Sequence, residues 1–215
     1  MSPSLRLLVL VVFLSTFLLM APAAFGQPTI VNFDFGAVPV GCSGWNFTYE
    51  GAVLTCNYPV TQNFNASPGF GWTLGWVLPL SGSPRFGGAG ITGPDSAINP
   101  PSFDGLPFNQ AAILQSLGSF VWQAVEGFKA ENYTLSFYLG GRTAYYNGPQ
   151  KIVAMIDGYV IGTWDVPVGM PFTLETAKFA VGTDGTHALE FMGMNPYDTT
   201  AFVSYVTIAP AGQAP

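Results

Sequence analysis

The chain has 215 residues, about the size of one β-sandwich domain, and only 8% of them are charged. Its 49% hydrophobic and 15% aromatic residues argue against a disordered chain, which is poor in aromatics and rich in charge. Glycine and proline are abundant, at 26 and 18 residues. They also disfavour coiled coils and helical bundles, which need Ala, Glu, Lys and Leu on a helical period. The formal net charge of −6 argues against nucleic-acid binding, because that needs clustered Lys and Arg. The composition predicts an all-β domain rich in turns.

Residues 1–26 have the zones of a secretory signal peptide: a short start with one positive charge, the apolar run Leu7–Met20, and a small-residue stretch. The run is shorter than the about 20 apolar residues of a transmembrane helix. Cleavage after Ala23 or after Gly26 would leave small residues at the −1 and −3 positions. We expect residues 27–215 to form one exported domain, periplasmic or extracellular, without stable membrane insertion.

The two cysteines, Cys42 and Cys56, lie in the exported part and enclose a short loop. In an oxidising compartment we expect them to form a disulfide. The loop-closure model gives such a bond about 3 kcal/mol of stabilisation. The alternative is a pair of buried free thiols.

The N-terminal part is irregular, with a strand-like stretch at 29–35 and a second at 72–77 between loops rich in Gly, Pro, Asn and Ser. From Gln110 onward a period of two becomes strong, which indicates β-strands. Residues 133–139 alternate apolar and polar side chains, and this pattern predicts a half-buried strand.

The C-terminal part predicts a chain of antiparallel strands. Asp157-Gly158 separates the apolar stretches 151–156 and 159–164, and this dipeptide closes a two-residue hairpin. Another turn is expected at 183–185, and a last strand at 201–208. We find no internal repeat or linker, so the sequence predicts one antiparallel β-sandwich of eight to eleven strands. Its core is expected to include Ile113, Leu114, Val121, Leu135, Phe137, Ile152, Ile156, Leu189, Phe191, Phe202 and Val206.

A search for catalytic and metal-binding patterns gives little. His187, the single histidine, shares a strand face with Leu189 and Phe191, which favours a structural role. The chain lacks a nucleophile elbow, a His-Glu-x-x-His motif, a Cys-x-x-Cys motif and a P-loop. Its twelve acidic residues do not single out the carboxylate pair of a glycosidase. The sequence therefore predicts that the protein is not an enzyme and has no metal site or cofactor.

The segment between the strands that end near 140 and begin near 150 favours ligand binding. It contains Arg142, Tyr145, Tyr146, Asn147 and Gln150, a mixture of guanidinium, phenol and amide groups. Aromatic faces cover the C–H surfaces of sugars, while amides and Arg bond to hydroxyls. The alternative is that Arg142 and the tyrosines brace a long loop. Three tryptophans are expected in the core or at its edge rather than as stacking platforms: Trp72, Trp76 and Trp122.

Several short motifs occur in an order that resembles exported bacterial proteins of the galactose-binding-like jelly-roll family, relatives of carbohydrate-binding modules. The resemblance covers about residues 32–208 and implies an antiparallel jelly-roll β-sandwich outside the cytoplasm that binds glycans. The motifs are Gly71-Trp72-Thr73, Phe103-Asp104-Gly105, Ala112 to Gln115, Gly118-Ser119 with Gln123 to Val125, Tyr133 to Phe137, Arg142 with Tyr146 to Gly148, Ile156 to Gly158, and Thr200 to Val203 with Val206 to Ile208.

The chain also departs from that family. Similar proteins open with Asn-x-x-Phe-Glu and tend to carry Asp where this chain has Ser204. Acids in the terminal strands of this fold often bind a structural calcium ion, and here Asp34 and Asp198 could substitute for them.

We therefore expect a secreted, non-catalytic protein whose partner is a glycan or polysaccharide. The alternative is a structural or adhesive surface protein that acts through protein–protein contacts, since low charge leaves a neutral surface available for association.

Overall fold

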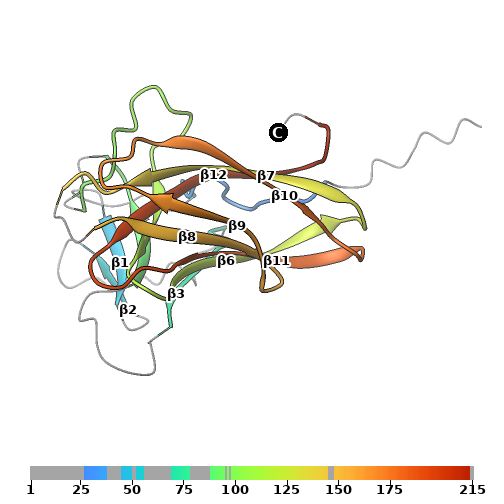
Figure 1. The fold of residues 1–215 in the computed structure, drawn as a ribbon, viewed down its shortest axis with the longest axis horizontal. Helices are drawn as coiled ribbons and strands as arrows, with labels where there is room; N and C mark the ends of the chain where they lie inside the picture. The colour runs from blue at the N-terminus through green and yellow to red at the C-terminus, as the bar shows by residue number, and fades with distance from the viewer. Residues whose placement is uncertain are drawn as a thin grey trace, which may run out of the picture.

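The computed structural model describes two sheets packed face to face (Figure 1). The described residues are 27–37, 69–77, 88–94, 96, 98–144 and 148–213, together with the backbone of 45–49 and 52–55. They form twelve strands, and every pair of neighbours in the sheets is antiparallel. This confirms the antiparallel jelly-roll β-sandwich. Within these ranges, no helix has the length and apolar character that crossing a bilayer requires.

One sheet has seven strands in the order β10-β7-β12-β5-β4-β1-β2. Strand β12 therefore lies inside this sheet, hydrogen-bonded to β7 on one side and to β5 on the other. The strands are β1 (Trp45–Tyr49), β2 (Ala52–Thr55), β4 (Gly88–Thr92), β5 (Ala111–Gln115), β7 (Asn132–Gly141), β10 (Thr173–Ala180) and β12 (Thr200–Pro210).

The other sheet has five strands in the order β3-β6-β11-β8-β9. Its middle strand, β11, pairs with β6 and β8, so its outward-facing side chains lie between those of two neighbours. The strands are β3 (Thr73–Trp76), β6 (Ser119–Phe128), β8 (Gln150–Ile156), β9 (Tyr159–Val166) and β11 (Gly185–Gly193).

The core fills the space between the two sheets. Along β6, Val121 and Val125 are fully buried, whereas Trp122 between them is 36% exposed, as the period of two requires. All the residues predicted for the core are buried. Two of them, Ile113 and Phe202, belong to a second apolar cluster on the opposite face of the seven-stranded sheet.

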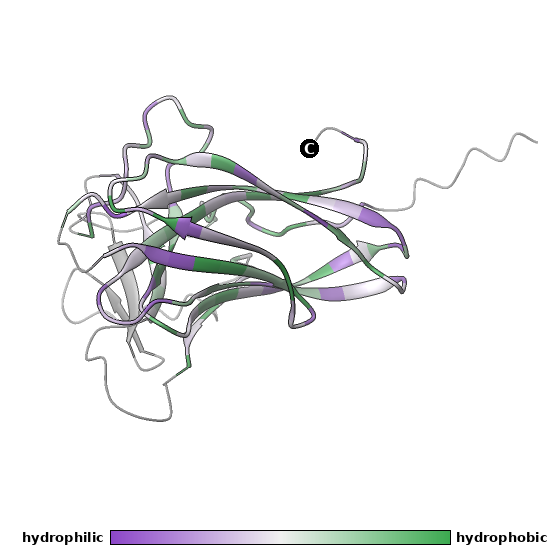
Figure 2. Ribbon diagram, in the orientation of Figure 1, coloured by the Kyte–Doolittle hydropathy of each residue, from purple (hydrophilic) through white to green (hydrophobic). Residues whose placement is uncertain are grey.

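The predicted turns are confirmed. Asp157 and Gly158 have φ of 50° and 80° and join β8 to β9 in a two-residue turn. The 183–185 turn joins β10 to β11. At this end Asp184 accepts hydrogen bonds from Lys129 Nζ (2.8 Å) and Ala130 N (2.9 Å), so it ties two turns together. Hydrophilic residues gather at this end of the molecule in Figure 2.

The strand expected at 29–35 does not form. Thr29 makes an isolated bridge to Glu126, and the chain then turns, with φ of 53° at Asn32 and 59° at Phe35. Positive φ cannot continue a strand, and the alternation of apolar residues did not reveal these two positions. The twelve described strands also exceed the predicted eight to eleven, because β1, β2 and β4 have only four or five residues each.

The outer face of the seven-stranded sheet is covered over part of β7, β12 and β5, whereas on β10 it is exposed. Ser136 of β7 points outward and is only 2% exposed, and Tyr138 lies in the second apolar cluster. That cluster joins the sheet to the loop between β4 and β5, and its buried members are Ile98, Phe103, Phe108, Ala111, Ile113 and Phe202. The half-buried strand expected at 133–139 is confirmed at Thr134 and Tyr138, which keep intermediate exposure, but not at Ser136, which is buried.

Candidate functional site

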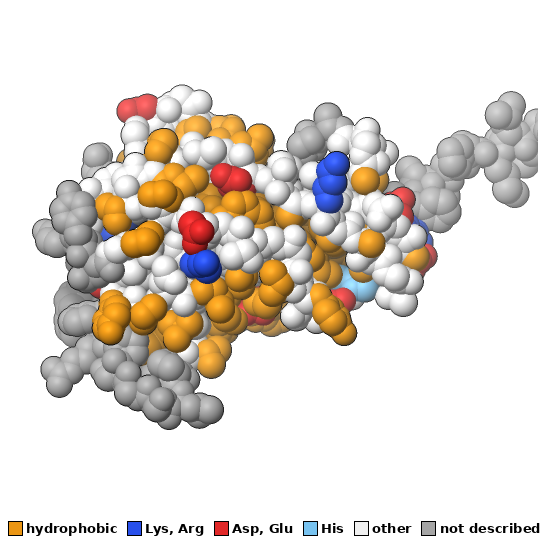
Figure 3. All heavy atoms as spheres, in the orientation of Figure 1, with side chains coloured by type: hydrophobic (Ala, Val, Ile, Leu, Met, Phe, Trp, Pro, Cys, Tyr) orange, Lys and Arg blue, Asp and Glu red, His pale blue; other side chains and the backbone are white. Residues whose placement is uncertain are grey.

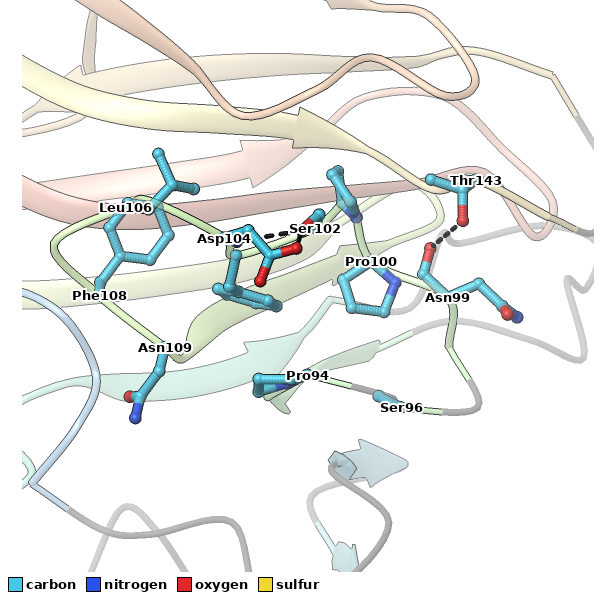
Figure 4. Close-up of a pocket in the computed structure, with 12 residues that line it drawn as sticks. Pro94, Ser96, Asn99, Pro100, Ser102, Asp104, Leu106, Phe108, Asn109 and Thr143 are labelled. Atoms are coloured by element: carbon cyan, nitrogen blue, oxygen red, sulfur yellow. Dashed lines mark hydrogen bonds between the residues drawn. The ribbon is translucent and has the colours of Figure 1, made fainter.

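A pocket of about 590 Å³ lies in the loop that covers the seven-stranded sheet (Figure 4). We call it the loop pocket. Its volume is within the range of small-molecule sites. Almost all of its wall comes from the connection between β4 and β5, and Thr143 adds the start of the connection after β7. The lining residues are Pro94, Ser96, Asn99, Pro100, Pro101, Ser102, Phe103, Asp104, Leu106, Phe108, Asn109 and Thr143.

From Pro100 to Phe108, the backbone of this loop is held by local contacts. Pro100 and Pro101 fix φ over two successive residues. Ser102 Oγ accepts a hydrogen bond from Asp104 N (3.0 Å) and donates one to Asp104 Oδ2 (2.8 Å). Gly105, at φ 73°, then lets the chain turn back toward Phe108. These contacts fix the part of the pocket wall that Ser102 to Phe108 form.

Aromatic rings form the base of the loop and fix it to the sheet. Phe103 and Phe108 pack edge to face, with ring centroids 5.9 Å apart. Phe172 lies 5.0 Å from Phe103 and 5.2 Å from Phe108, and Tyr138 lies 5.2 Å from Phe108. The pocket therefore has an apolar side that belongs to a packed cluster.

Polar groups form the other side of the pocket. Thr143 donates two hydrogen bonds to the carbonyl oxygen of Asn99, from N (2.9 Å) and from Oγ1 (3.1 Å), which closes one end (Figure 4). Hydroxyl and amide groups line the remainder, and Asp104 is the one acidic side chain among the lining residues. This combination of an apolar wall, hydroxyls, amides and one carboxylate can bind a small polyhydroxylated ring.

Gly140 allows the loop to approach β7. A Cβ at this position would come within 2.9 Å of Pro101 Cγ and 3.0 Å of the Phe172 ring. Both atoms belong to the packing that shapes the pocket, so the missing side chain is a requirement of the site.

Arg142 lies immediately before Thr143 and forms an ion pair with Asp198, with 2.8 Å between Nη1 and Oδ1. The pair is largely buried, and Gln115 also donates a hydrogen bond to Asp198. The Arg142 backbone joins neighbouring segments too, because its carbonyl oxygen accepts a hydrogen bond from Gly169 N (2.8 Å). These contacts support the bracing alternative for Arg142, and ligand binding by its side chain stays a prediction.

Gln150 is 1% exposed, and its amide is used inside the protein. Its Nε2 donates to the carbonyl oxygen of Thr199 (3.0 Å), and its Oε1 accepts from Asn195 N (2.8 Å). The geometry favours a structural role for Gln150, which holds the turn between β11 and β12. Tyr145, Tyr146 and Asn147 lie outside the described residues, and so do Cys42 and Cys56.

His187 has the structural role that its neighbours indicated. Its Nδ1 lies 2.5 Å from Asp157 Oδ2, and its Nε2 lies 3.0 Å from the carbonyl oxygen of Thr183. Burial alone would lower the pKa of His187, but these two hydrogen bonds and the charge of Asp157 raise it. Burial would likewise raise the pKa of Asp157, whereas the hydrogen bonds from His187 and from Ala188 N lower it.

The residues considered for calcium do not fit that ion. Asp198 faces the Arg142 guanidinium, and a second cation there would meet a positive charge. Asp34 accepts a hydrogen bond from Gly36 N (3.0 Å). Its neighbour Phe33 accepts a hydrogen bond at its carbonyl oxygen from Val206 N, in the second half of β12. Asp198 instead precedes β12, so the two carboxylates belong to different parts of this strand. Among the described residues, no three His, Cys, Asp or Glu side chains form a group that could hold a metal ion.

No family model matches the chain, and no curated protein matches it. Among solved structures, the chain is similar to the apo form of a cyclase from Fischerella sp., with 15% identity over 86% of this chain and 97% of that chain, and a TM-score of 0.53. It is also similar to a Stig cyclase from Fischerella sp. TAU in complex with (3Z)-3-(1-methyl-2-pyrrolidinylidene)-3H-indole, with 14% identity, 86% and 98% coverage, and a TM-score of 0.52. A carbohydrate-binding module in complex with calcium and xylotriose matches at 15% identity, 64% and 98% coverage, and a TM-score of 0.39. At these identities the likeness is one of fold.

The comparisons contradict the prediction that the protein is not an enzyme. The solved structures that share its fold over 86% of the chain are cyclases, so enzymes are built on this type of sandwich. A search for short motifs misses such sites, because a sandwich assembles its functional groups from strands and loops far apart in sequence.

Sequence reasoning also missed most of the loop pocket. In the sequence, Phe103 and Asp104 stand out as part of a short motif of the resemblance, and the prolines and asparagines around them indicate only a loop. Among the described residues of the predicted segment after β7, Thr143 is the one that lines the pocket. The sequence signal for this pocket was the presence of Phe103 and Phe108 in a Pro-rich loop, because apolar rings in a loop need another surface to pack against.

Proposed function

We propose that this protein binds a carbohydrate in the loop pocket. The observation that carries the proposal is the lining itself, where Phe103 and Phe108 provide an apolar wall and Asn109, Ser102 and Asp104 provide hydrogen-bonding groups. One ring of a sugar has the same division, with C–H faces and hydroxyl edges. The position of Thr143 supports a contribution from the segment after β7.

Glycan-array binding followed by titration calorimetry tests the proposal. We expect Asn109→Ala and Asp104→Asn to weaken binding of the retained glycan about tenfold each, the effect of losing one good hydrogen bond. Asp165→Asn is the matched control, because Asp165 is exposed on β9 and outside the pocket. A folded wild-type protein that retains no glycan would overturn the proposal, and unchanged binding by both variants would place the site elsewhere.

The same experiment measures chemical change. Mass spectrometry of the glycan after incubation shows whether it is bound intact or converted, which bears on an enzyme role without assuming one. A converted product would point to Asp104, since it is the acidic group in the lining. Asp104→Asn would then reduce turnover more than binding.

We also propose that the protein acts outside the cytoplasm. The support is the zoned segment 1–26, followed by a domain low in charge. N-terminal sequencing of the protein recovered from its host should give a chain that begins at Ala24 or Gln27. A chain that retains the apolar run Leu7–Met20 would contradict the proposal.

A further inference from the structure

The outer face of the five-stranded sheet carries two rows of side chains that run across its strands. Cross-strand partners share a face, so the register places their side chains side by side. We call this surface the sheet platform. Its first row is Thr73, Trp122, Glu190, Met155 and Val160, and its second row is Gly75, Phe120, Met192, Val153 and Thr163. Figure 3 shows hydrophobic side chains gathered where β8, β9 and β11 lie.

The platform is mostly apolar. Phe120 lies across Gly75, because a Cβ on Gly75 would enter its ring. Trp122 is 36% exposed, so its indole contributes to the surface instead of the core. This differs from the expectation that Trp122 packs at the core or its edge. Two thioethers, from Met155 and Met192, adapt to the shape of a bound ring better than branched side chains do.

Glu190 is the one ionisable residue of the platform. It lies directly between Trp122 on β6 and Met155 on β8. Within the described ranges, its carboxyl makes no hydrogen bond or ion pair with another residue. Burial raises the pKa of Glu190.

On this face, the nearest cation of the described segments is already paired. Lys151 forms an ion pair with Asp165, with 3.2 Å between Nζ and Oδ1. Lys151 is four residues from Met155 along β8, about 13 Å at the usual rise of a strand. Glu126 is four residues from Trp122 along β6 and adds negative charge. None of these neighbours supplies a positive charge to Glu190, so a ligand can act as its partner.

We propose that the sheet platform binds a flat, mostly apolar ring compound that carries one weakly basic nitrogen, with the nitrogen against Glu190 and the ring over Trp122 and Met155. A base suits this carboxyl in either protonation state. The neutral acid donates its proton to the nitrogen, and the carboxylate accepts one from the protonated nitrogen. A sugar fits less well, because its many hydroxyls would find few polar partners on these rows. This site is separate from the loop pocket, which lies on the other sheet.

Quinoline and naphthalene test the proposal on the unaltered protein, because they have the same shape and differ in one ring nitrogen. Titration followed by NMR should show that quinoline binds about tenfold more tightly than naphthalene. Trp122→Ala should weaken both compounds. Glu190→Leu should bring the two affinities within about twofold of each other, while Glu126→Leu, the same change on the same face, should keep the preference.

Equal affinities of the wild type for quinoline and naphthalene, or binding of neither compound, would overturn the proposal. Survival of the preference in folded Glu190→Leu would do the same. Because the first comparison uses no variant, it decides the matter even if a substitution prevents folding. The glycan experiment has its own variants and controls, so each of the two proposals can fail alone.

Discussion

The ion pair between Arg142 and Asp198 joins the end of β7 to the segment that leads into β12. The two side chains are 12% and 23% exposed, and Gln115 at the end of β5 donates to the same carboxylate. A guanidinium satisfies several acceptors with one planar fork, which an ammonium group cannot reproduce. The arrangement holds three neighbouring strand ends beside the loop pocket.

Arg142→Lys should therefore lower the free energy of unfolding by roughly 1–3 kcal/mol, the penalty for buried polar groups that lose partners. Urea denaturation checks this. Asp165→Asn, which breaks an exposed ion pair, serves as the control and should leave the free energy of unfolding nearly unchanged. An Arg142→Lys protein with unchanged stability but weaker glycan binding would instead assign Arg142 to the ligand.

The His187–Asp157 pair predicts a dependence of stability on pH. Both ring nitrogens face acceptors, which favours the doubly protonated ring. The pKa of folded His187 lies above its model-compound value of 6.5, so its contribution is full below pH 6.5 and is lost as pH rises through the folded pKa. The pKa of folded Asp157 lies below 3.8, so its contribution is present above pH 3.8 and is lost as pH falls through the folded pKa.

Unfolding free energies measured by urea titration at about pH 5.5 and pH 8.5 should show the wild type more stable at the lower value, because His187 is protonated there in the folded state. His187→Gln removes the titrating group and should flatten this difference. Equal stability of the wild type at both pH values would show that His187 does not bind an additional proton on folding.

At the scale of elements, the loop between β4 and β5 is seated on the seven-stranded sheet through β7. Gly140 faces Pro101 and Phe172 with no side chain of its own. The loop and the sheet therefore form one packed unit, and the shape of the pocket depends on a strand position outside its lining.

Gly140→Ala should move Pro101 and the Phe172 ring and cost roughly 1–3 kcal/mol of stability, as overpacking does. Thermal unfolding measures the cost, and glycan titration should show weaker binding. Gly182→Ala is the control, because a Cβ on Gly182 meets no atom within 4 Å and its φ lies outside the left-handed region. Equal melting temperatures for the two variants would show that the loop is not held at Gly140.

Sequence reasoning succeeded where side-chain alternation and turn chemistry act locally. The Asp157-Gly158 hairpin and the buried faces of β6, β7 and β11 follow from such patterns. It failed where a distant segment decides the outcome. Tyr138 on the outer face of β7 packs against the aromatic cluster of the loop, whereas Trp122 is exposed because the corresponding face of β6 has no such cover among the described segments.

At the scale of the whole molecule, the pairing of Cys42 with Cys56 remains a prediction for the exported chain. Intact mass should fall about 2 Da below the reduced value if the disulfide forms, and alkylation of unfolded protein without reductant should add nothing. Reduction should lower stability by about 3 kcal/mol. Uptake of two alkylating groups without reductant would contradict the disulfide and weaken the argument for export.

The position of β12 also determines what a truncation does to the molecule. Its residues come after those of all the other described strands, yet it lies inside its sheet, between β7 and β5. Without Thr200–Pro210, the pair β10-β7 has no hydrogen-bonded connection within this sheet to the group β5-β4-β1-β2. A chain that stops before Thr200 would therefore have this sheet divided in two, whereas the loss of an edge strand would only make it narrower.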